Sequence, residues 1–60
     1  MNLTQKELQL LDEQLLKEQI LIKKYRCYAK DCSDPELKAL CNRAADKHQQ
    51  YMNTLIGFLQ

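Results

Sequence analysis

The sequence has very little glycine, proline or tryptophan. Its 60 residues include one glycine, one proline and no tryptophan, whereas leucine, lysine, glutamine and glutamate are frequent. Glycine and proline interrupt helices most strongly, so their scarcity favours long, continuous helices. The strict alternation of apolar and polar residues that marks a half-buried strand does not extend over a useful length. These absences together predict an all-α protein.

Long apolar runs and charge of one sign are also missing. No apolar run exceeds three residues, as in Ile20–Ile22, so we expect no membrane span. Nine basic and eight acidic residues are interspersed. Lys23, Lys24 and Arg26 form the only basic cluster, which a solvated helix face explains, so we expect no nucleic-acid binding. The N-terminus lacks the basic segment and apolar core of a signal peptide, which predicts an intracellular protein.

The three cysteines favour reduced thiols, because their number is odd and no secretory signal accompanies them. Cys32 and Cys41 fall among apolar positions and are expected to pack as small core residues. Cys27 lies at an outward position and is expected to be the most reactive thiol. The three cysteines lack the convergent C-x2-C spacing of a zinc site. We therefore expect neither a zinc site built from these cysteines nor a catalytic cysteine.

Two helices are predicted on either side of Ser33–Pro35. Thr4 and Glu7 form a capping box, which begins a helix over about 4–32. Pro35 disfavours helical geometry at the residue before it and fits the first turn of a second helix, over about 35–57. Gly57 is a candidate terminating residue. A turn this short makes the helices antiparallel, so the sequence predicts one helical hairpin domain, 1–60.

Apolar residues recur in each helix at alternating steps of three and four, which marks one buried face. The residues expected at the helix interfaces are Leu8, Leu11, Leu15, Ile22, Tyr25, Leu37, Cys41, Ala44, Tyr51, Leu55 and Phe58. A two-helix unit this small buries little surface and leaves its other faces wet. We therefore expect a homo-oligomer, most simply a dimer in which two hairpins form a four-helix bundle.

A second apolar face on the first helix lies off this seam. It consists of Leu10, Leu16, Ile20 and Leu21, and a contiguous apolar face of this kind normally marks a protein contact. Burial within the homodimer and recognition of a separate partner protein are both compatible with it. In the second case the protein would be a small interaction adaptor.

Glu18 and His48 are the polar residues that interrupt the two stripes. Glu18 lies fifteen residues before Ser33 and His48 fifteen after it, so a hairpin folded at this turn brings them to the same layer. One interpretation is a mutual hydrogen bond that fixes the helix register, as single buried polar residues do in coiled coils. A second is that both side chains lie at the edge of the seam and reach water.

A third interpretation is a metal site. A two-fold dimer would bring two carboxylates and two imidazoles together, a set suited to zinc or iron. Carboxylate-bridged di-iron bundles, however, use Glu-x-x-His motifs, and the residue three before His48 is Ala45. Asp46 is rotated about 200° from His48 around the helix and cannot substitute. Glu18 and His48 thus remain the only candidate metal ligands, and no other cofactor is expected.

The order of these elements resembles the spore coat F family of Gram-positive endospore formers. The fragments that carry the resemblance are Leu11–Asp12, Leu15–Leu16 with Glu18, Tyr25, Asp34–Leu37 with Leu40, His48–Gln49, Tyr51–Asn53 and Gly57–Phe58. The resemblance covers most of the chain from about residue 8. It implies a ferritin-like helical domain and a structural, non-enzymatic protein of the spore coat that contacts other coat proteins. Members often carry an acidic residue ahead of the histidine, where this chain has Ala45, and this departure argues against a metal role.

Overall fold

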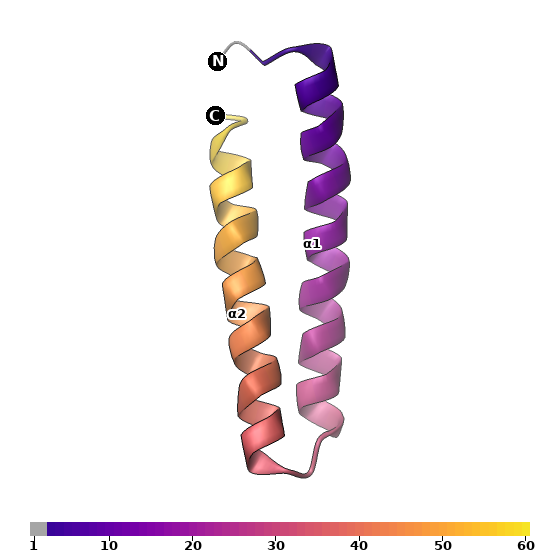
Figure 1. Ribbon diagram of the computed structural model, residues 1–60, viewed down its shortest axis with the longest axis vertical. Helices are drawn as coiled ribbons and strands as arrows, with labels where there is room; N and C mark the ends of the chain where they lie inside the picture. The colour runs from indigo at the N-terminus through magenta and orange to yellow at the C-terminus, as the bar shows by residue number, and fades with distance from the viewer. Residues whose placement is uncertain (1–2) are drawn as a thin grey trace.

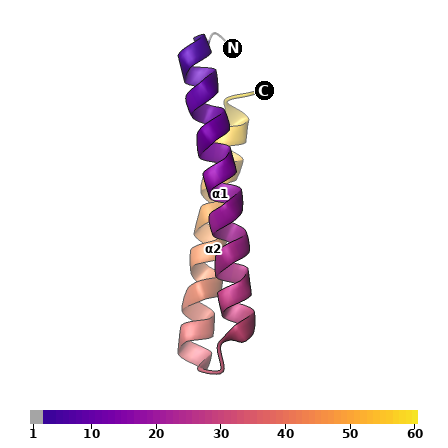
Figure 2. The same cartoon turned by 90° about the vertical axis from the view of Figure 1, so that its right-hand side faces the viewer.

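Residues 3–60, the part of the chain that the computed structural model describes, form two antiparallel α-helices joined by a short turn (Figure 1). The molecule is rod-shaped, with Cα extents of 46 × 14 × 11 Å. Seen from the side, the two helices cross at a shallow angle and stay adjacent along their length (Figure 2). The start of α1 and the end of α2 lie at the end opposite the turn (Figure 1). The predicted helical hairpin is therefore confirmed.

The first helix, α1 (Gln5–Asp31), starts at the predicted capping box. The Thr4 hydroxyl accepts a hydrogen bond from the Glu7 amide at 3.1 Å, and the Thr4 amide donates to Glu7 Oε1 at 2.9 Å. The hydrogen bond that the Thr4 backbone donates has the larger effect in lowering the pKa of the Glu7 carboxyl, and the hydrogen bond with the Thr4 side chain lowers this pKa further. This reciprocal pair satisfies two amides that have no partner within the helix.

The turn ends α1 and starts α2 (Pro35–Gly57) within three residues. Cys32 leaves the helix in extended geometry while its amide still donates to the Tyr28 carbonyl at 2.9 Å. Asp34 is the N-cap of α2, and its Oδ1 accepts from the amides of Glu36 and Leu37 at 2.8 and 3.0 Å. Pro35 occupies the first turn, where a missing amide costs nothing. The turn is thus built from side-chain capping rather than from glycine.

The C-terminal end of α2 differs from the sequence expectation for Gly57. Gly57 is the last helical residue, but no residue among 3–60 has the positive φ that favours glycine at a helix end. The chain instead tightens, and the amides of Phe58 and Leu59 donate to the carbonyls three residues earlier at 3.1 and 2.9 Å. Bonds of this spacing commonly complete a helix end without left-handed geometry.

Few residues are buried between the helices. Within residues 3–60 the buried positions are Leu11, Glu18 and Ala29 of α1 and Ala45 of α2. Ala45 is fully buried, and the small side chains of Ala29 and Ala45 allow the helix backbones to approach each other. The interior of the hairpin thus holds three apolar residues and one carboxylate, which is a small core for a chain of this length.

We predict that Asp34→Ala lowers the free energy of unfolding by about 1 kcal/mol, because two amides at the start of α2 lose their acceptor. Thermal unfolding followed by circular dichroism measures this change. Ser33→Ala is the matched control, since it leaves the Asp34 carboxylate in place. Equal stability of the Asp34→Ala variant and the parent would contradict the capping role.

Candidate functional site: a buried glutamate–histidine layer

Glu18 of α1 and His48 of α2 meet in the middle of the seam. His48 Nδ1 lies 2.6 Å from Glu18 Oε1. The Glu18 side chain is 3% exposed and the His48 side chain 32% exposed, so the carboxylate is enclosed while the imidazole reaches the surface. An ionised carboxylate only accepts hydrogen bonds, so Nδ1 carries the proton in that state. The structure therefore brings together the two polar residues that interrupt the apolar stripes.

Two tyrosines of α1 extend this layer. The Tyr25 ring stacks on the His48 imidazole with a centroid separation of 5.6 Å and an interplanar angle of 17°. Tyr28 meets Tyr25 edge to face, at 6.5 Å and 88°. The imidazole is thus held by a hydrogen bond at Nδ1 and by an aromatic ring on one face. The sequence placed Tyr25 on the seam but gave no sign of its stacking on His48.

The layer is suited to fixing the axial position of the helices. A buried carboxylate without a partner is destabilising by several kcal/mol, and Glu18 has its partner only when His48 lies at the same height. Sliding one helix by a turn, about 5.4 Å, would separate the two groups. Apolar side chains alone discriminate less sharply between such registers.

The other predicted interface residues differ in how far the hairpin covers them. Leu11 is buried, and the half-buried group is Leu15, Ile22, Tyr25, Cys41, Ala44 and Leu55. Four remain exposed in the single hairpin: Leu8, Leu37, Tyr51 and Phe58. In the candidate partner face, Leu10, Leu16 and Ile20 are exposed and Leu21 is half-buried. The most buried residue, Ala45, lies beside the stripe position Ala44.

Arg26 forms a second polar contact between the helices, which the sequence did not indicate. Its guanidinium donates to Asp46 Oδ1 at 2.6 Å and to Asn42 Oδ1 and the Asn42 carbonyl at 3.0 and 3.3 Å. Both members of the ion pair are substantially exposed, so the pair itself adds little stability. Arg26 is therefore a bridge between α1 and α2 rather than part of a solvated basic cluster.

One hairpin offers two potential metal ligands, Glu18 and His48. Within residues 3–60 no group of three or more His, Cys, Asp or Glu side chains is placed to hold a metal ion. Asp46, the nearest acidic residue before His48, is engaged by Arg26. A metal centre at Glu18 and His48 would need ligands from a second copy of the chain.

The three thiols occupy different environments. Cys27 is exposed, whereas Cys32 and Cys41 are half-buried beside the turn. Burial raises the pKa of the Cys32 thiol, and the neighbouring Cys41 thiol raises this pKa further. Less of Cys32 is therefore ionised at neutral pH, and the thiolate is the reactive form.

We predict that removing one member of the polar layer has unequal effects. His48→Leu leaves the buried Glu18 carboxylate unpaired and should lower the free energy of unfolding by roughly 2–3 kcal/mol. Glu18→Leu should be less harmful, because the imidazole still reaches water. The double variant should regain part of the loss while keeping its helices. Urea unfolding measures the free energy of unfolding of all three variants. Equal losses of stability in the two single variants would contradict the predicted difference between them.

We also predict an order of thiol alkylation. Iodoacetamide at neutral pH should modify Cys27 severalfold faster than Cys32, because Cys27 is exposed and the raised pKa of Cys32 leaves less thiolate. The Cys32 rate should increase as the pH is raised toward its pKa. Peptide mass spectrometry over a time course gives the order, and faster modification of Cys32 at neutral pH would contradict it.

Comparisons with known proteins place this chain in no family. No family model matches it, and neither the curated proteins nor the solved structures contain a match. Among the described residues, neither helix is long and apolar enough to cross a membrane. A function is therefore inferred from the structure of the hairpin.

Proposed function

We propose that this chain is a non-enzymatic structural protein that acts by self-association, with two hairpins forming a four-helix bundle. The observation that carries the proposal is the amount of surface that one hairpin leaves exposed. Its accessible surface is 4932 Å². A compact monomer of 7.1 kDa exposes roughly 4,100 Å² on the size scaling of globular proteins, so the hairpin has about 800 Å² in excess.

This excess is the size of one side of a stable protein interface. Specific complexes bury about 800 Å² on each partner. Within residues 3–60, ten large apolar side chains are substantially exposed, whereas three apolar residues are buried. A second copy of the chain offers the same surface in return, which makes a two-fold dimer the simplest way to cover it.

The polar layer supports a structural role for the site. Glu18 is enclosed, its acceptor oxygen is bonded to His48, and Tyr25 covers one face of the imidazole. These contacts hold the groups in place and specify how the helices align. In the proposed bundle the layer sets the register within each hairpin, and apolar surface supplies the association.

The resemblance to the spore coat F family supplies a setting for this assembly. A coat is built from many protein copies in contact, so a small rod with an uncovered apolar surface fits such a layer. The exposed apolar surface of the hairpin supports self-association without reference to that setting.

Sedimentation equilibrium tests the proposal. We predict a particle of about twice the 7.1-kDa chain mass at micromolar concentration. A monomeric mass up to the near-millimolar range would contradict it. Metal analysis of the same sample, purified without a histidine tag, separates the alternative: a stoichiometric metal bound per dimer would replace the structural role with metal binding through Glu18 and His48.

A further inference from the structure

The exposed apolar side chains are concentrated on one side of the hairpin. In an α-helix, residues eighteen apart are separated by five whole turns and point the same way. Leu10 and Tyr28 of α1 are eighteen apart, and so are Leu40 of α2 and Phe58, which follows α2 with its backbone still in right-handed helical geometry. Tyr51 is eleven residues after Leu40, an offset of about 20°. We call this side the Tyr51 face; its exposed members are Leu10, Tyr28, Leu37, Leu40, Tyr51 and Phe58.

An apolar groove joins the two helices on this face. It has a volume of about 300 Å³ and lies near the free ends of the hairpin. Its walls are Glu7, Leu10, Leu11 and Gln14 of α1, Tyr51 and Leu55 of α2, and two residues just outside the helices, Leu3 and Phe58. Leu37 and Leu40 lie on the same side of α2 closer to the turn, so exposed apolar residues of this face occur near both ends of the rod.

The opposite side of the hairpin carries a polar bridge. Arg26 is sixteen residues after Leu10 and lies about 160° around α1 from it. Its contacts with Asn42 and Asp46 span the helices on that side. Covering this ion pair would remove water from two charges, which offsets much of any gain in association.

The outer faces of the two helices are also poorer candidates. The outer face of α2 carries the exposed polar residues Glu36, Arg43, Lys47, Gln50 and Thr54. The outer face of α1 has Leu16 and Ile20, but Gln9, Glu13 and Lys23 surround them. Leu16 and Ile20 lie on one helix, whereas a bundle of two hairpins needs a face made by both helices.

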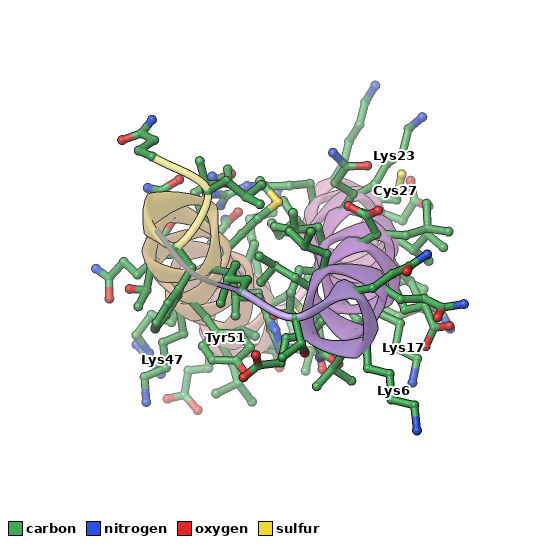
Figure 3. The ribbon with its side chains drawn as sticks, turned by 90° about the horizontal axis from the view of Figure 1, so that it is seen from above. Lys6, Lys17, Lys23, Cys27, Lys47 and Tyr51 are labelled. Carbon is green, nitrogen blue, oxygen red and sulfur yellow. The ribbon has the colours of Figure 1, made fainter. Side chains whose placement is uncertain are left out.

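Lysines border the Tyr51 face. Seen along the rod, Tyr51 lies on one side of the helix pair, with Lys6 and Lys17 projecting from α1 and Lys47 from α2 toward the same side (Figure 3). An apolar centre with aromatic residues and a charged rim is the usual composition of a protein interface. Lys23 and Cys27 project from other parts of the surface.

We infer that the Tyr51 face is the surface on which a second copy of this chain packs, face to face about a two-fold axis. The inference rests on the proposed self-association and adds which surface is used. In this dimer, Leu10 and Tyr28 of one copy pack against the Tyr51 face of the other, which carries the groove. It leaves the Arg26 bridge and the polar outer face of α2 in water.

Matched charge substitutions test the choice of face. Leu40→Glu with Tyr51→Glu should weaken dimerisation by roughly 100-fold or more, because buried anchors of an interface lose their contacts. The control, Leu16→Glu with Ile20→Glu, places the same charges on the outer face of α1 and should change the dissociation constant by less than about threefold. Sedimentation measures both.

A crosslinking experiment covers the case in which the charged variant fails to fold. Benzoylphenylalanine in place of Tyr51 keeps an aromatic side chain and should give a covalent dimer on irradiation, whereas benzoylphenylalanine in place of Ile20 should not. Dimer formation from position 20 alone, with dissociation caused by the Leu16 and Ile20 charges, would overturn the face but leave self-association standing. A monomeric parent protein would overturn both.

Discussion

A hairpin of two helices has a single seam, and the rest of this structure depends on that constraint. The seam of residues 3–60 encloses Leu11, Ala29 and Ala45 together with Glu18. Burial of so little apolar surface offsets only a fraction of the conformational entropy lost on folding. A partner that covers more apolar surface would offset more of this entropy, and a separate contact is needed to fix the register of so small a seam. The Glu18–His48 layer fixes the register, and the Tyr51 face is the surface proposed for the partner.

The polar layer and the Tyr51 face are connected through the tyrosines of α1. Glu18 bonds to His48, His48 stacks on Tyr25, and Tyr25 meets Tyr28 edge to face. Tyr28 belongs to the exposed Tyr51 face, so these contacts lead from the enclosed carboxylate to the surface proposed for association. A second copy packed on Tyr28 would restrict the ring that supports the imidazole. Association and helix register would then reinforce each other.

Local chemistry made much of the hairpin predictable from its sequence. The Thr4–Glu7 box and the Asp34–Pro35 start require only neighbouring residues, so both were readable without tertiary information. The meeting of Glu18 and His48 followed from their equal distance from Ser33. The extent of burial was less predictable, since an apolar stripe covers a wider arc than one neighbouring helix can enclose. Tyr51 and Phe58 consequently lie on the stripe yet remain exposed in the hairpin.

Other features depend on the three-dimensional crossing of the helices. In α2 the most buried residue is Ala45 rather than the stripe position Ala44, which lies about 100° away around the helix. A drift of about 20° per heptad is too small to account for this difference in a helix of 23 residues. The sequence predicts a solvated face for Arg26. No sequence pattern indicates that its guanidinium reaches Asn42 and Asp46 on the other helix. α2 ends at Gly57 as the sequence predicts, but backbone hydrogen bonds to the carbonyls three residues earlier complete this end rather than a left-handed glycine.

The proposed association with a second copy should stabilise this fold. The dependence of the thermal midpoint on protein concentration tests it most directly, because a dimer that dissociates as it unfolds gains stability by mass action. For a two-chain unit of this size the midpoint should rise by roughly 5–6 °C for each tenfold increase in concentration. A midpoint that stays constant over a thousandfold range would contradict the claim.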